Sequence, residues 1–131
     1  MKKDIETRTD IEFLIWDFYK QLKTDETIGF IFTEVLQLDF DKHIPVICDF
    51  WESVLLHNPV YQGNVMHKHI DLDKKVKLLP EHFDRWMELF LGITNQHFEG
   101  EVTDELIKRV NLIKPLMQFK VESSRDSGFI Q

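Results

Sequence analysis

The chain has 131 residues, of which 43% are hydrophobic, so it can bury one core and is too short for two domains. Its formal net charge of -7 argues against nucleic acid as a partner, because phosphate binding depends on clustered Lys and Arg. The lone cysteine, Cys48, excludes an internal disulfide, and the charged N-terminus lacks the apolar run of a signal peptide or membrane anchor. We therefore expect one cytoplasmic domain that does not bind membranes.

The first predicted helix begins near Thr9, because Thr9 and Glu12 have the spacing of a capping box. Tyr19 falls at the edge of its apolar face, where it can be an ordinary amphipathic residue at the border of the core. That face repeats at helical spacing through Ile11, Leu14, Ile15, Phe18 and Leu22. The short segment 28–32 is dense in apolar residues and should pack inward.

A second helix is predicted from residue 43 or 44 to residue 57. Asp39 and Asp41 are cap candidates, but Pro45 would break a hydrogen bond if the helix had already begun. His43 lies one turn before Ile47 and can point into the space that this helix covers. We expect the first turn to be distorted around His43.

Residues 58–79 show neither helical nor strand periodicity and form a long connector, which is typical of a functional loop. Pro80 suits the first position of a third helix, over 80–98, and Gly100 should end it. Its predicted inner stripe consists of Phe83, Trp86, Met87, Phe90, Leu91 and Thr94.

Thr103 is the predicted cap of the last helix, and Pro115 should kink it. Every strong segment has helical period, so the predicted fold class is all-α. We expect one domain over residues 1–121 and a polar, disordered tail over 122–131.

Two histidines in the connector, His67 and His69, are the candidate ligands of a cofactor. Because they are two residues apart, only one can enter a pocket. His69 is followed by Ile70 and Leu72, which could cradle a flat apolar group, so it is the better candidate. His67 is a weaker one, and two ordinary histidines remain the third alternative. Three further histidines are expected to be structural or exposed: His57, His82 and His97.

Five segments follow one another along the chain: Phe18-Tyr19, Gly29-Phe30-Ile31-Phe32, His43 ahead of Phe50-Trp51, Lys68-His69-Ile70-Asp71-Leu72, and the run from His82 to Phe90. In this order and at these intervals they resemble the group III truncated haemoglobins, and the resemblance extends from about residue 10 to 119. The resemblance implies a two-over-two helical sandwich that encloses one haem b, iron protoporphyrin IX. It also implies that His69 ligates the iron and that Phe32 stacks on the porphyrin.

The same resemblance makes Tyr19, His43 and Trp86 the distal residues, which face the bound ligand. Tyr19 and Trp86 can donate hydrogen bonds, and His43 can donate or accept. The expected ligands are dioxygen, nitric oxide, carbon monoxide or peroxide, with slow oxygen release. Further residues expected to contact the haem are Phe50, Trp51, Met66, Ile70 and Phe83, with Lys68 and Arg85 as partners for its propionates.

No reductase domain is encoded, so any nitric oxide or peroxide chemistry would need a separate reductase as the electron donor. We expect a monomer. Two alternatives remain: a haem-based gas sensor or storage protein, and a helical interaction module without a cofactor.

Overall fold

The computed structural model describes residues 2–35, 37–61 and 77–124. It contains the helices α1 (Arg8–Leu22), α2 (Phe40–Leu55), α4 (Pro80–His97) and α5 (Glu101–Ser123), and a π-helical turn, η1 (Ile31–Val35). Within these ranges the only β-type pairing is an isolated bridge between Lys3 and Phe98. The all-α prediction is confirmed.

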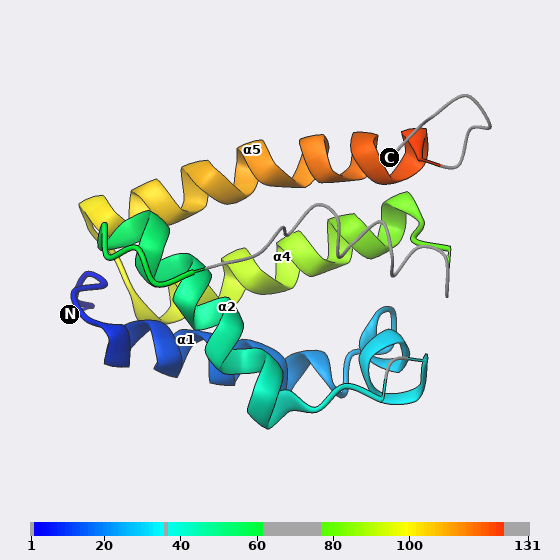
Figure 1. Ribbon diagram of the computed structural model, residues 1–131, viewed down its shortest axis with the longest axis horizontal. Helices are drawn as coiled ribbons and strands as arrows, with labels where there is room; N and C mark the ends of the chain where they lie inside the picture. Colours follow the sequence, from blue (N-terminus) through cyan, green and yellow to red (C-terminus); the bar gives the residue numbers. More distant parts are fainter. Residues whose placement is uncertain (1, 36, 62–76, 125–131) are drawn as a thin grey trace.

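The four long helices pack around one core. α1 packs against both α2 and α4, α4 also packs against α5, and α2 makes a smaller contact with α5. Figure 1 shows α4 between α5 and α1, with α2 crossing in front of them. This arrangement agrees with the two-over-two sandwich that the sequence suggested.

α1 is capped two residues earlier than predicted. The hydroxyl of Thr7, not Thr9, accepts a hydrogen bond from the backbone N–H of Asp10, and the Asp10 carboxylate accepts one from the N–H of Thr7. Lys3 pairs with the same carboxylate at 3.1 Å and helps to hold it there. The predicted apolar face is buried, and Tyr19 is part of it rather than at its edge.

α2 also begins before its predicted start. Asp39 is the N-cap, because its side chain accepts a hydrogen bond from the backbone N–H of Lys42, and His43 already lies in the first turn. Pro45 is therefore inside the helix, where it removes one backbone bond. The predicted start at residue 43 or 44 is therefore wrong, because the loss of this one hydrogen bond does not prevent the helix from beginning at Phe40. The helix is held on both sides of the proline by its buried stripe, which consists of Ile44, Cys48, Trp51 and Leu55.

The N-terminus of α5 is capped from the other end of the chain. The Asp4 carboxylate accepts hydrogen bonds from the backbone N–H groups of Val102 and Thr103 and from the Thr103 hydroxyl, at 2.7–2.9 Å. The prediction that Thr103 caps this helix is therefore wrong, because Thr103 lies inside it. Gly100 precedes the helix with φ +138°, and a Cβ atom there would lie 2.5 Å from Asp4, so both conformation and space require glycine.

α4 agrees with its prediction at the start, Pro80, and ends one residue early, at His97. α5 continues as one helix through Pro115 to Ser123, so it extends two residues beyond the predicted domain boundary. Ile28 and Ile31 pack inward as expected, whereas Phe30 is exposed. Most of the predicted connector and tail, residues 62–76 and 125–131, lies outside the described residues.

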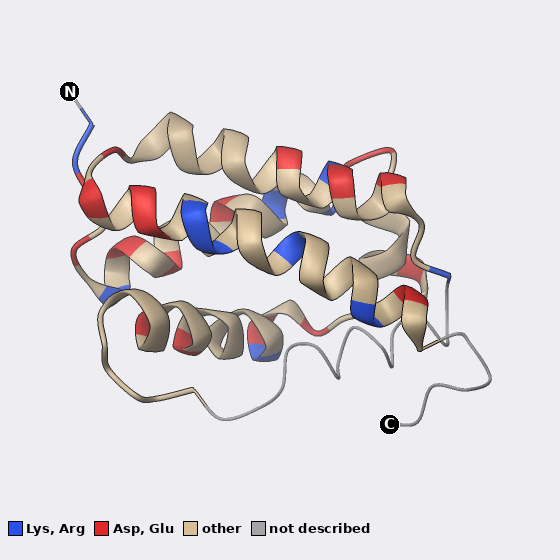
Figure 2. Ribbon diagram, turned by 90° about the horizontal axis from the view of Figure 1, so that it is seen from above, with Lys and Arg blue, Asp and Glu red and all other residues tan. Residues whose placement is uncertain are grey.

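Asp and Glu residues occur along several of the helices (Figure 2). In the described ranges no group of three or more His, Cys, Asp or Glu residues is arranged to hold a metal ion. None of the described helices is long and apolar enough to cross a membrane.

Candidate functional site

The centre of the candidate site is a hydrogen bond between α1 and α2. The hydroxyl of Tyr19 lies 3.0 Å from Nε2 of His43, and the ring planes are nearly perpendicular. Tyr19 is only 6% exposed, whereas His43 is half-buried. Burial raises the pKa of the Tyr19 phenol well above its usual value, and the nearby Cys48 adds to this shift. The phenol is therefore neutral and able to donate a hydrogen bond.

Aromatic rings surround Tyr19 on several sides. Its ring lies 5.1 Å from Phe18, 5.8 Å from Phe40 and 6.2 Å from Phe32, measured between centroids. Lys23 lies over the Phe40 ring at 4.3 Å. Phe32 thus lies beside the predicted distal tyrosine. Phe40 was not predicted for this site, because its position at the start of α2 carries no local signal of a contact with α1.

Trp86 belongs to a stack of rings that joins α4 to α2. Its indole lies 5.4 Å from Phe90 at an interplanar angle of 13°, and Phe90 lies 5.8 Å from Trp51 at 20°. Phe90 and Trp51 are buried, but Trp86 is half-buried. In the described part of the chain no hydrogen bond involves the indole N–H of Trp86. That donor is available to a bound molecule.

Stacked aromatic rings connect α2 and α4. These two helices are not among the closely packed pairs of described helices, and the Trp51–Phe90 stack bridges them. Several apolar side chains that pack against the core are only partly buried: Phe32, Ile47, Phe50, Val54, Trp86 and Met87. A planar hydrophobic molecule that contacted these residues would cover the apolar surface that they leave exposed.

Arg85 is already paired within the protein. Its guanidinium donates to Asp25 at 2.7 Å and also to Glu88. Burial favours the protonated Asp25 carboxyl, but hydrogen bonds from Arg85 and from backbone N–H groups outweigh this and hold the pKa of Asp25 below its usual value. If Arg85 also bound a haem propionate, its guanidinium would donate to that group as well as to Asp25 and Glu88.

The other predicted site residues divide into two sets. Phe83 and Trp51 are buried in the core, and Phe50 contacts Trp51 and Tyr61 through its ring. The connector residues predicted for the site lie outside the described residues: Met66, His67, Lys68, His69 and Ile70.

The remaining histidines have structural or exposed positions, as predicted. His82 accepts a hydrogen bond at Nδ1 from the backbone N–H of Leu79 and so caps α4. A ring nitrogen of His97 lies 2.7 Å from the Asp17 carboxylate, and His57 is exposed.

Together, the four packed helices and the absence of strands in the described residues are those of an all-α, truncated globin fold. The structure matches the crystal structure of the group III truncated haemoglobin from Campylobacter jejuni with a TM-score of 0.80 and 26% identity, over 92% of this chain and 95% of that one. The chain is 27% identical over 116 residues to the group 3 truncated haemoglobin ctb of Campylobacter jejuni, covering 86% of this chain and 89% of that protein. No family model matches the chain. The resemblance to group III truncated haemoglobins is thus confirmed in both sequence and fold.

Proposed function

We propose that this protein binds haem b between α2 and α4 and binds dioxygen and other small ligands at the haem iron. The observation that carries the proposal is the Tyr19–His43 pair, 3.0 Å apart, on a chain whose fold matches a truncated haemoglobin. Trp86 is linked to Tyr19 through the ring of Phe18. Haem supplies an iron centre that takes dioxygen, nitric oxide, carbon monoxide or peroxide as a ligand. His69 is the iron ligand in this proposal, from its match to the family motif.

The chain's own residues orient and hold the ligand. Trp86 offers its indole N–H from α4. Tyr19 offers its O–H from α1 in the tautomer in which Nε2 of His43 carries the proton and donates to the phenol oxygen, whereas in the other tautomer Tyr19 donates to His43. Hydrogen bonds to a ligand that has gained negative charge contribute about 1.5–3 kcal/mol each. Two such donors favour slow ligand release over rapid delivery.

Apolar and charged side chains would hold the macrocycle. Phe32 and Phe50 would contact its faces, and Lys68 and Arg85 are the candidate partners for its propionates. Catalytic turnover with nitric oxide or peroxide would require electrons from a separate reductase. We expect the protein to act as a monomer.

A titration with haem, followed by tryptophan fluorescence, tests the proposal. The chain has three tryptophans, and Trp51 and Trp86 lie at the proposed site, so quenching should saturate at one haem per chain. Phe50→Ala should weaken haem binding about tenfold or more, from the loss of roughly 1.5–3 kcal/mol of apolar contact.

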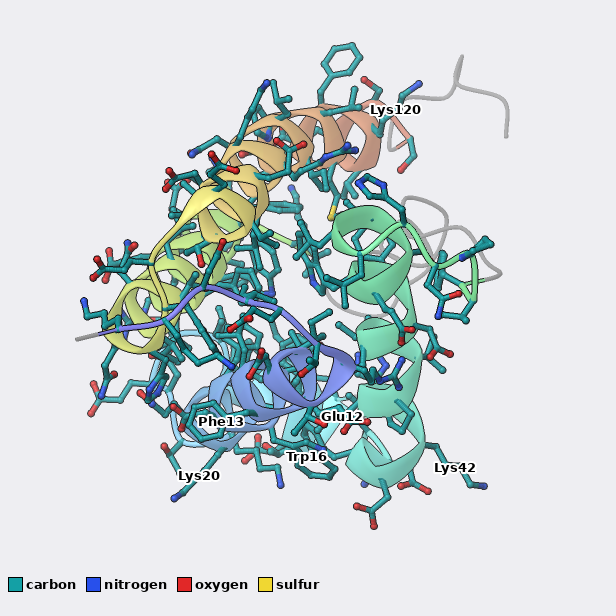
Figure 3. The ribbon with its side chains drawn as sticks, turned by 90° about the vertical axis from the view of Figure 1, so that its left-hand side faces the viewer. Glu12, Phe13, Trp16, Lys20, Lys42 and Lys120 are labelled. Carbon is teal, nitrogen blue, oxygen red and sulfur yellow. The ribbon has the colours of Figure 1, made fainter. Side chains whose placement is uncertain are left out.

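Phe13→Ala is the matched control for this titration. Phe13 lies on the outer face of α1 (Figure 3) and is 54% exposed, so its loss should leave haem affinity unchanged. Quenching without a saturation point, or equal effects of the two substitutions, would contradict the proposed site.

A further inference from the structure

The Tyr19 hydroxyl contacts one group that can accept its proton. Among the described residues, His43 is its only hydrogen-bond partner, at 3.0 Å. Phe18, Phe32 and Phe40 surround the ring and exclude water from it. A phenol that loses an electron becomes a strong acid, so its oxidation is easy only where a base can take the proton at once. A neutral imidazole nitrogen within hydrogen-bond distance is such a base.

We propose that Tyr19 and His43 form a proton-coupled redox pair, in which Tyr19 gives up one electron while its phenol proton passes to Nε2 of His43. The pair would serve as an internal electron donor to peroxide at the ligand site, and this use of it rests on the proposed function. The redox property itself belongs to the two side chains and does not depend on haem.

A chain of rings connects Tyr19 to the solvent-accessible part of the site. The Phe18 ring lies 5.1 Å from Tyr19 and 6.0 Å from Trp86, and Trp86 is half-buried. An electron can therefore leave the buried tyrosine toward an oxidant near Trp86 across one intervening ring. His43, also half-buried, can exchange the proton with solvent.

The electrons and protons of the reaction balance with two oxidations of Tyr19. Reduction of one hydrogen peroxide molecule to two water molecules takes two electrons and two protons. Each oxidation of Tyr19 supplies one electron and releases one proton through His43. An external one-electron reductant of the ascorbate class then returns an electron and a proton to the tyrosyl radical.

Flash oxidation of the purified full-length protein with a photogenerated ruthenium(III) tris-bipyridine oxidant, followed by freezing and electron paramagnetic resonance, tests the pair. The chain has only two tyrosines, so Tyr61→Phe leaves Tyr19 as the sole source of a tyrosyl signal. The double variant Tyr19→Phe/Tyr61→Phe confirms the assignment. His43→Leu and His43→Gln are then made in the Tyr61→Phe protein, with the exposed His57→Gln as the matched control.

We expect a tyrosyl signal in Tyr61→Phe that forms at least twofold more slowly in D2O. His43→Leu should lower its yield at least fivefold and remove the isotope effect, and His57→Gln should change neither. His43→Gln should also lower the yield, although its amide can still accept a hydrogen bond, because it is a far weaker base. If His43→Leu does not fold, the yield in His43→Gln tests whether His43 accepts the proton of Tyr19.

Absence of a tyrosyl signal in Tyr61→Phe, or an unchanged yield and isotope effect in the His43 variants, would overturn the proposal. Neither result depends on haem occupancy, which the haem titration measures separately. The redox pair and the haem-binding function can therefore fail independently.

Discussion

Tyr19 and His43 are hydrogen-bonded at 3.0 Å although they lie on different helices. The pairing depends on how α1 and α2 cross, and Arg8 fixes part of that crossing. From the first turn of α1, the Arg8 guanidinium donates to Asp49 at 2.6 Å and to Glu52 at 2.9 Å, both on α2. The distal side of the proposed site is thus held by contacts at the far end of the same helix pair.

Tyr19→Phe should speed oxygen release from the haem-loaded protein. The substitution keeps the ring contacts but removes one donor to the ligand, and a loss of about 1.5–3 kcal/mol corresponds to about tenfold or more in the dissociation rate. Stopped-flow displacement of oxygen by carbon monoxide measures this rate. Tyr61→Phe is the control and should match the wild type. Equal rates for Tyr19→Phe and wild type would remove Tyr19 from the account of ligand binding.

Asp4→Asn should destabilise the protein by about 1–2 kcal/mol at neutral pH, because the carboxylate caps α5 and favours its positive N-terminus. Burial favours the protonated Asp4 carboxyl, but hydrogen bonds from Val102 and Thr103 outweigh this and lower the pKa. A lowered folded-state pKa stabilises the fold at pH values above the unfolded pKa, about 3.9. That stabilisation is lost as the pH falls through the folded-state pKa.

Urea unfolding of wild type and Asp4→Asn at several pH values checks this prediction. The difference in free energy of unfolding should be largest near neutral pH and should shrink as the pH falls from about 5 toward 3. Asp104→Asn, an exposed aspartate in the first turn of α5, is the control. A difference that stayed constant with pH would show that the Asp4 charge does not contribute.

Phe90→Ala should cost about 3–5 kcal/mol of stability, because Phe90 is 1% exposed and its ring joins Trp51 to Trp86. The same substitution at Phe119, which is 64% exposed on α5, should change stability by no more than about 0.5 kcal/mol. Denaturant unfolding of both variants measures the contrast. Similar costs at the two positions would mean that the ring stack is not the centre of the core.

The fold was predictable from sequence because each helix has a repeating apolar face. The buried stripe of α1 is the one that spacing predicted. In α4 the prediction omitted Ile93, which is buried, and included Trp86, Met87 and Leu91, which are only partly buried. The helix starts were less predictable. Thr7 and Thr9 are both plausible caps by type, and only the position of Asp10 decides between them. Pro45 indicated a late start for α2, but the packing of the helix against α1 outweighed the lost bond.

The contacts of the candidate site depend on pairs that are distant in sequence. Asp4 caps α5 and Asp25 binds Arg85, and nothing near either residue in sequence indicates its partner. The prediction that Tyr19 and His43 belong to one site came from the family resemblance, because helical spacing alone placed Tyr19 at the edge of the core. Phe40 and its contact with Tyr19 were missed for the same reason.

The most direct test of the haem-binding account is the visible absorption spectrum of the haem-reconstituted protein in its ferric, ferrous and ferrous carbon-monoxide forms. His69→Ala is compared with His67→Ala, which removes a histidine only two residues away. The account predicts a sharp Soret band that shifts on reduction and on carbon-monoxide binding. The band should be lost or altered in His69→Ala and unchanged in His67→Ala. Spectra like those of free haem in the wild type, or equal effects of the two substitutions, would contradict histidine-ligated haem at this site.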